Sequence, residues 1–210
     1  MQTIVIASQK GGVGKTTIAG HLAVAAEQEG AGPVAVIDTD PQGSLSSWWN
    51  ERQAEGPAFA QANIHHLPEQ LAGLAAAGMK LCVIDTPPAV TETIARVLAA
   101  ADLVVIPTRP SPHDLRAVGS TVELVEAAGR RMVFVVNGAA HRARLTSQAA
   151  VALSQHGTVA PVTLYQRTDY AASMIDGRTV QELDPSSKSA AEIAELWKYV
   201  SMQLRKRAVA

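Results

Sequence analysis

The chain has 210 residues, 47% of them hydrophobic and 18% charged, with a formal net charge of −1 at pH 7. This length and composition predict one globular domain, residues 1–210, and exclude a disordered chain. The near-zero charge excludes a global attraction to nucleic acid or anionic lipid, so such binding needs a local patch. One cysteine, Cys82, excludes an intramolecular disulfide. Because the sequence also lacks a membrane-length apolar run and a secretory leader pattern, we expect a cytoplasmic protein.

Short apolar runs rich in β-branched residues recur along the chain and predict buried strands. In chain order they cover residues 3–7, 34–38, 81–85, 103–107, 132–137 and 159–164. Helical patterns lie between them, at residues 16–29, 68–77, 91–101, 113–128 and 145–155. This alternation predicts an α/β fold with a doubly wound, mostly parallel twisted sheet flanked by helices. Ligands of such sheets bind at the carboxyl ends of the strands.

Two further stretches are predicted in less detail. Residues 43–66 are irregular and indicate a short helix plus a connection. Near the end of the chain, Ser189 and Glu192 have the spacing of a capping box and predict the start of the last helix. An apolar stripe at helical spacing follows, formed by Ile193, Leu196, Trp197, Val200 and Leu204.

The segment SQKGGVGKTT at residues 8–17 lies between the first predicted strand and the first predicted helix. This is the context of a phosphate-binding loop, in which glycines let backbone N–H groups approach phosphate oxygens. We expect Lys15 to reach the β- and γ-phosphates, Thr16 to ligate Mg²⁺ and Thr17 to bond an α-phosphate oxygen. The predicted nucleotide-binding residues of the loop are Gly11, Gly12, Val13, Gly14, Lys15, Thr16 and Thr17.

Acidic residues stand at the ends of two other predicted strands. Asp38 ends the second strand, Asp40 follows two residues later, and Asp85 ends the third strand. A carboxylate at a strand end that faces a phosphate loop is an expected Mg²⁺ partner, often through water. Taken alone, each aspartate is more simply a turn former. Three of them beside one loop favour a metal site.

Several motifs together resemble the ParA/MinD family of ATPases. The loop has Gln9 where the usual pattern has its first glycine, and Lys10 follows, so that KGGVGKT at residues 10–16 resembles the deviant Walker A motif of that family. DTDPQG at residues 38–43 resembles the segment after its second strand, and VIDTPP at residues 83–88 its Walker B motif. Residues 100–115 are most similar to its short plasmid-partition members, and residues 185–196 match its closing helix more loosely. The resemblance extends from residue 1 to about residue 200.

The resemblance implies roles for individual residues. Lys10 would reach across a nucleotide-sandwich dimer to the ATP phosphates of the partner subunit, and Gly11 would lie where the subunits approach most closely. Asp40 would position the attacking water, while Asp38 would support the Lys15 and Mg²⁺ region. Asp85 would hold Mg²⁺ through water. Asn137 matches a position that contacts adenine in the family, although a strand-terminal turn residue is nearly as good an interpretation.

The family also implies a function. We expect a slow, Mg²⁺-dependent ATPase that forms a homodimer on ATP, binds DNA non-specifically and is stimulated by a ParB-like or adaptor protein. It would be associated with the nucleoid and position a plasmid, a chromosome region or a protein cluster. The candidate DNA-contacting cations are Arg142, Arg144, Arg178, Lys198, Arg205, Lys206 and Arg207. No helix-turn-helix precedes the first strand, so operator-specific binding is not expected.

Other branches and classes are less favoured. The iron-protein branch needs cysteine ligands for a cluster, and one cysteine does not supply them. A MinD-like membrane-surface regulator needs an amphipathic C-terminal helix, and residues 193–207 are amphipathic with a basic end. We expect their stripe to pack in the core instead, without stable membrane association. A small-molecule kinase or ligase would need a second substrate pocket.

Overall fold

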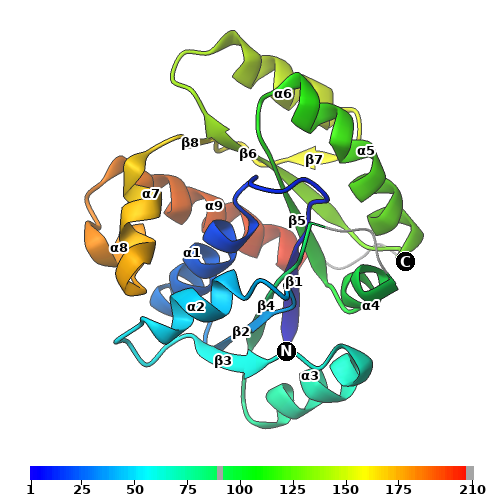
Figure 1. Ribbon diagram of the computed structural model, residues 1–210, viewed down its shortest axis with the longest axis vertical. Helices are drawn as coiled ribbons and strands as arrows, with labels where there is room; N and C mark the ends of the chain where they lie inside the picture. Colours follow the sequence, from blue (N-terminus) through cyan, green and yellow to red (C-terminus); the bar gives the residue numbers. More distant parts are fainter. Residues whose placement is uncertain (89–91, 207–210) are drawn as a thin grey trace.

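The computed structural model describes residues 1–88 and 92–206 of the chain, and its centre is a parallel β-sheet (Figure 1). The strands lie in the order β3-β2-β4-β1-β5-β6-β7, and β8 pairs with β6 outside this path. All pairings between the described strands are parallel. Strand β1 has β4 on one side and β5 on the other, so the chain winds outward from the centre in both directions. The predicted doubly wound sheet is confirmed.

The predicted strands and helices agree with the structure at most positions. The strands are β1 (Gln2–Ile6), β2 (Val34–Asp38), β3 (Ala58–Gln61), β4 (Leu81–Asp85), β5 (Leu103–Thr108), β6 (Met132–Ala139), β7 (Thr158–Val159) and β8 (Leu164–Tyr165). The α-helices are α1 (Lys15–Gln28), α2 (Ser44–Asn50), α3 (Leu67–Ala76), α4 (Glu92–Ala99), α5 (Pro112–Ala127), α6 (Arg144–Ser154), α7 (Thr168–Ser173), α8 (Val180–Leu183) and α9 (Lys188–Arg205). Two 3₁₀ helices are η1 (Ile64–His66) and η2 (Met174–Asp176). Thr91, where one predicted helix begins, lies outside the described residues.

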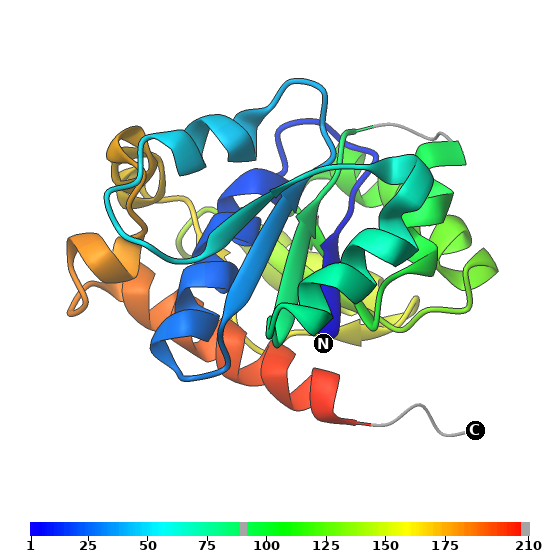
Figure 2. The same ribbon diagram turned by 90° about the horizontal axis from the view of Figure 1, so that it is seen from below.

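Side chains that alternate along the strands build one core on each face of the sheet. In β1, Ile4 and Ile6 face the layer formed by α1, α2, α8 and α9, whereas Val5 faces α4, α5 and α6. The two helical layers are seen on either side of the strands in Figure 2. Because both faces are covered, successive residues of a strand are all apolar, which explains the continuous apolar runs of the sequence.

The prediction of a single strand at residues 159–164 is wrong. The chain instead forms β7 and β8, which pair with separate parts of β6: Val159 lies beside Phe134, and Leu164 beside Asn137. Ala160 N still donates to the Phe134 carbonyl, but Pro161 follows and has no N–H to continue the ladder. The proline therefore divides the apolar run into two short strands.

The predicted capping box at Ser189 and Glu192 is also wrong. Ser187 caps α9, and its hydroxyl accepts from Ala190 N at 3.1 Å. Ser189 is fully buried inside the helix, where its hydroxyl donates to Asp169 at 2.7 Å. Glu192 accepts from the Arg167 guanidinium at 2.6 Å. The Ser189 and Glu192 side chains thus bind distant residues instead of the backbone N–H groups at the start of α9.

Residues 43–66 contain the predicted short helix, α2, and also a strand that the sequence analysis missed. The edge strand β3 pairs with β2, with Phe59 beside Val36. The strand has four residues, of which three are half-buried and one is exposed. An edge strand needs neither a long apolar run nor strict alternation, so its sequence signal is weak.

The apolar stripe of α9 packs in the core, as expected. Its five side chains are between 0% and 5% exposed and belong to the core layer that includes α1. At the end of the helix, Gln2 Nε2 donates to the Leu204 carbonyl at 3.1 Å, next to the amino end of β1. Among residues 1–88 and 92–206, no helix has both the length and the apolar character to cross a bilayer.

His21, a buried residue of α1, makes the stability of the fold depend on pH. Its Nδ1 lies 2.7 Å from the Thr17 carbonyl, and its Nε2 accepts from Val180 N at 3.2 Å, an arrangement that requires the neutral Nδ1–H tautomer. Complete burial lowers the pKa of His21 to about 4, even though Thr17 and Glu182 favour the charged form. Since the unfolded chain binds this proton near pH 6.5, stability is complete above that pH and falls as the pH decreases toward 4.

We therefore expect protonation of His21 to remove about 3 kcal/mol of the free energy of unfolding between pH 7 and pH 4. Denaturant unfolding of the wild type and of His21→Gln at several pH values measures this contribution, because the Gln side chain does not titrate. The stability difference between the two proteins should shrink as the pH falls. His66→Gln, at an exposed position, serves as control. A stability difference that stays constant over this range would contradict the assignment.

Candidate nucleotide site

The phosphate-binding loop connects β1 to α1 at the carboxyl edge of the sheet. Gly14 forms the N-cap of α1 with a φ of 89°, in the left-handed region that glycine adopts without strain. A Cβ on Gly14 would also collide with Asn137 Nδ2. The backbone angle therefore favours glycine here, and any other residue would also displace the Asn137 side chain. Val13 is 1% exposed, so its buried side chain anchors the loop.

Lys15 begins α1 and turns back over the loop. Its Nζ donates to the Lys10 carbonyl at 3.4 Å, and its side chain is largely buried. Burial lowers the pKa of Lys15, while the carboxylates of Asp85 and Asp40 oppose this shift. The structure thus brings together a partly desolvated cation and two of the three predicted acidic residues, an arrangement suited to binding an anion next to a metal ion.

Thr16 and Asp85 form a second pair beside the loop. The Thr16 hydroxyl donates to Asp85 Oδ2 at 2.6 Å, and Thr86 N donates to Asp85 Oδ1 at 3.0 Å. Burial raises the pKa of Asp85 to about 7 despite these hydrogen bonds. A hydroxyl and a buried carboxylate that lacks full charge compensation are hard oxygen donors of the kind Mg²⁺ prefers. The residues present therefore fit a magnesium ion held together with phosphate oxygens and water.

Asp38 and Asp40 occupy the segment between β2 and α2 and differ in their contacts. Asp38 is 7% exposed and accepts from Asp40 N at 3.0 Å and from Ser46 N at 2.9 Å. These bonds fix the segment and the first turn of α2. Asp40 uses one oxygen to accept from Gln42 N at 2.9 Å, and its side chain lines the cleft above the loop. Of the two carboxylates, Asp40 is the one open to a ligand.

The helix α2, which follows Asp40, is fixed to the C-terminal part of the chain. The Trp48 indole packs against Gly20 of α1, and its Nε1 donates to the Arg178 carbonyl at 3.0 Å. Arg52 lies over the Trp48 ring and forms a bidentate ion pair with Glu182. The Asp40 segment is thereby held between two rigid parts of the fold.

Lys10 and Gln9 lie on the outer side of the loop. The Lys10 side chain is exposed, which is compatible with the predicted contact to a partner subunit. Gln9 N donates to the Thr121 hydroxyl of α5 at 3.2 Å, and Lys10 N donates to the Ser8 hydroxyl at 3.3 Å. The first part of the loop is therefore attached to α5, which explains how it keeps a fixed path without the usual first glycine.

The structure places Asn137 against the loop itself. Its Nδ2 donates to the Val13 carbonyl at 2.6 Å. This bond supports the loop from β6, and the side chain stands beside the site. The contact to adenine stays a prediction.

An open cleft of about 780 Å³ lies above the loop. Among the predicted residues, it is lined by Gly11, Gly12, Gly14, Lys15, Thr16, Thr17 and Asp40. The cleft is also lined by residues without a predicted role, among them Ser47, Trp48, Arg109 and Ile175. Trp48 and Ile175 come from α2 and η2, whose approach to the loop depends on tertiary packing. Arg109 directly follows β5, and its position at a strand end was the signal that could have identified it.

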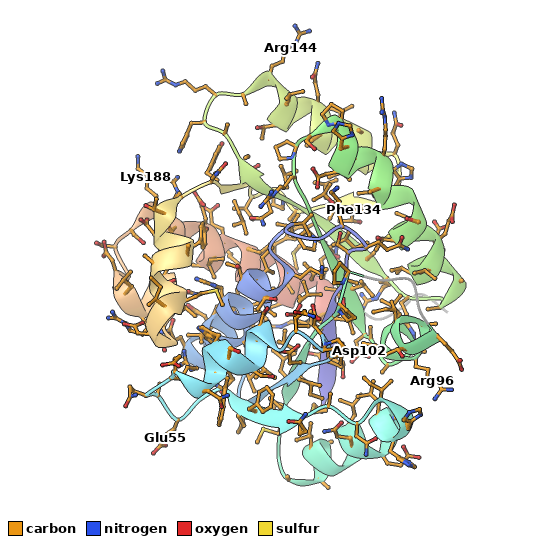
Figure 3. All side chains as sticks on the ribbon, in the orientation of Figure 1. Glu55, Arg96, Asp102, Phe134, Arg144 and Lys188 are labelled. Carbon is orange, nitrogen blue, oxygen red and sulfur yellow. The ribbon has the colours of Figure 1, made fainter. Side chains whose placement is uncertain are left out.

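The candidate DNA-contacting cations that the structure describes lie on separate elements of the subunit. Arg142 and Arg144 are exposed at the start of α6, and Figure 3 shows Arg144 at the outer end of the molecule. Arg178 pairs with Asp176 at 2.7 Å. Lys198 and Arg205 are on α9, and Lys206 follows it. Arg207 lies outside the described residues.

The comparison with protein families agrees with this geometry. Residues 4–190 match the family model described as CobQ/CobB/MinD/ParA nucleotide binding domain. The chain belongs to the ParA/MinD family. The resemblance of the sequence to this family is thus confirmed.

Relatives in this family include proteins that match nearly the whole chain. "Maintenance of carboxysome distribution protein A" of Halothiobacillus neapolitanus is 30% identical over 199 residues, covering 90% of this chain and 91% of that protein. Protein ParA of Rhizobium radiobacter is 26% identical over 218 residues, covering 99% and 97%.

Solved structures share the fold. The septum site-determining protein MinD of Pyrococcus horikoshii, complexed with Mg-ADP, has a TM-score of 0.79 at 18% identity and covers 100% of this chain and 99% of its own. Apo McdA of Cyanothece has a TM-score of 0.75 at 20% identity, covering 97% and 99%. At these identities the likeness concerns the ParA/MinD fold.

Proposed function

We propose that the protein is a Mg²⁺-dependent ParA-type ATPase that dimerises around ATP, binds DNA non-specifically in that state and positions a cargo. The observation that carries the proposal is the loop with one buried lysine, Lys15, and one exposed lysine, Lys10, beside Asp40 and Asp85. The relative named for carboxysome distribution supports a protein assembly as the cargo. A plasmid or a chromosome region is compatible with the same chemistry.

ATP binding in this proposal depends on the loop and on α1. Backbone N–H groups of Gly12 to Thr17 surround the phosphates, and the N-terminus of α1 adds partial positive charge. Lys15 neutralises the β- and γ-phosphates. Thr16 and Asp85 would hold Mg²⁺, which supplies charge neutralisation of the phosphate oxygens when bound.

Hydrolysis requires a water molecule held in line with the γ-phosphate. Asp40 lines the cleft, its backbone N–H donates to Asp38, and one oxygen of its carboxylate accepts from Gln42 N. We assign it the task of orienting this water. With Asp40 as the one group that orients the water, ATP turnover is expected to be slow. A partner protein that improves the alignment of this water with the γ-phosphate can accelerate hydrolysis.

Lys10 gives the site its dimeric character. Its exposed ammonium group would contact the ATP of the partner subunit, where charge develops during phosphoryl transfer. ATP then becomes part of the subunit interface and stabilises the dimer, and hydrolysis removes this contribution. In a dimer, the basic residues at the start of α6 and on α9 of both subunits would form one larger surface that binds DNA phosphates.

Co-sedimentation with plasmid DNA and with anionic liposomes, each with ATP or ADP, tests the proposed function. We expect binding to DNA with ATP only, decreasing as salt is raised from about 50 to 200 mM because the contacts are to phosphates. Liposomes should leave the protein in the supernatant, since the apolar stripe of α9 is buried. ATP-dependent binding to liposomes without binding to DNA would contradict the proposal and favour the MinD-like alternative.

A further inference from the structure

Arg109 is a cation at the cleft that has no part in the proposed binding and hydrolysis of ATP. Arg109 directly follows β5, the strand next to β1 on the side opposite to β4. It lines the same cleft as the loop glycines and Lys15. The phosphate loop thus has acidic Asp85 at the end of one neighbouring strand and a cation after the end of the other.

The path of the Arg109 side chain is set by its surroundings. Ser111 N donates to the Arg109 carbonyl at 2.8 Å, which closes a tight turn just after the strand. The side chain then runs along Gly138: a Cβ placed there would lie 3.6 Å from Arg109 Nε and 3.7 Å from its Cγ. Gly138 follows Asn137, which contacts the loop at Val13. Arg109 is therefore directed along the β6 edge of the loop.

The guanidinium of Arg109 has no partner in the described part of the chain. The ion pairs among residues 1–88 and 92–206 involve Arg52, Arg96, Arg167 and Arg178, and none includes Arg109. No hydrogen bond from its side chain is formed among these residues either. Five N–H donors are thus left for a ligand.

The charges of the side chains that line the cleft indicate that Arg109 favours the binding of an anion. Besides Arg109, the ionisable side chains that line the cleft are Lys15, Asp40 and Glu51. Without Arg109, one cation would face two carboxylates, an unfavourable field for a polyphosphate. With Arg109 the lining is balanced, and a bound magnesium ion together with the backbone amides would add net attraction.

We infer that Arg109 binds the phosphates of the nucleotide held in its own subunit, as a second cation beside Lys15. The inference rests on the proposed nucleotide binding and adds a residue to it. Guanidinium groups bind phosphate through paired N–H donors and keep their charge at all relevant pH values. The contact is made within one subunit, so it is present with ADP as well as with ATP.

Binding of a fluorescent ADP analogue to the monomeric protein tests the inference, because ADP isolates contacts within the subunit from those across a dimer. Arg109→Ala should weaken ADP binding about 10-fold, the effect of one charge-assisted contact. Arg109→Gln, which keeps length without charge, should lose as much, whereas Arg109→Lys should recover part of the affinity. The difference from wild type should diminish in high salt.

Two control variants separate the possible outcomes. Arg130→Ala, at an exposed arginine beyond the end of α5, should bind ADP like the wild type. Lys15→Ala, measured in the same titration, reports on the phosphate loop. If Lys15→Ala loses binding while Arg109→Ala stays within twofold of the wild type, the role of Arg109 is refuted and the proposed function stands. If neither variant loses affinity, the proposed nucleotide site itself is wrong.

Discussion

Replacing Lys15 by alanine should abolish ATP binding, with a loss of affinity of at least about 100-fold. The lysine is 7% exposed and shares its surroundings with two carboxylates. Removing its charge leaves these carboxylates to repel the triphosphate, and hydrogen bonds between charged groups are lost as well. Isothermal titration calorimetry with ATP and Mg²⁺ measures the effect.

The exposed Lys80 provides a matched control for Lys15, since it lies just before β4 at the opposite edge of the sheet. Lys80→Ala should bind ATP with the wild-type affinity. Circular dichroism would verify that both variants are folded. Unchanged ATP affinity in folded Lys15→Ala would refute the phosphate-loop assignment.

Replacing Asp40 by alanine should leave ATP binding within a few-fold of the wild type and reduce its turnover about 100-fold. The carboxylate lines the cleft but is not part of the loop that surrounds the phosphates. Positioning a nucleophile in the transition state contributes a factor of this order. Phosphate release over hours, together with nucleotide affinity, separates the two effects.

The side chain of Asp40 also accepts from Gln42 N, so a change in loop structure must be distinguished from a loss of water positioning. Asp40→Asn preserves an oxygen for this hydrogen bond but lacks the charge. We expect it to fold its loop normally and to remain slow. Wild-type turnover in Asp40→Ala, or full recovery in Asp40→Asn, would exclude a catalytic task for the carboxylate.

The central strands and the phosphate loop were predictable because their signals are local. Val34–Asp38 and Leu81–Asp85 are continuous apolar runs that end in aspartate, and parallel strands end at the same edge of the sheet. The pairing of β4 with both β1 and β2 then brings the aspartates to the loop. Local pattern and tertiary packing agree at these positions.

Other parts of the chain were less predictable because their structure depends on distant contacts. Glu192 binds Arg167 rather than capping α9. The wall of the cleft formed by Trp48 and Ile175 arises from the packing of α2 against η2 and α1, which no periodicity encodes. Arg109 lay within a recognised motif, yet its direction along Gly138 became visible only in the structure.

Sedimentation velocity of the Asp40→Ala protein and of the Lys10→Ala, Asp40→Ala double variant is the sharpest test of a two-subunit nucleotide site, because slow hydrolysis preserves the ATP state. With ATP, the first protein should sediment as a dimer and the second as a monomer, although both bind the nucleotide with similar affinity. Both should be monomers with ADP. Adding Lys188→Ala, at the exposed start of α9, in place of Lys10→Ala should leave the dimer intact. A double variant with Lys10→Ala that dimerises as strongly as its parent would contradict a two-subunit nucleotide site.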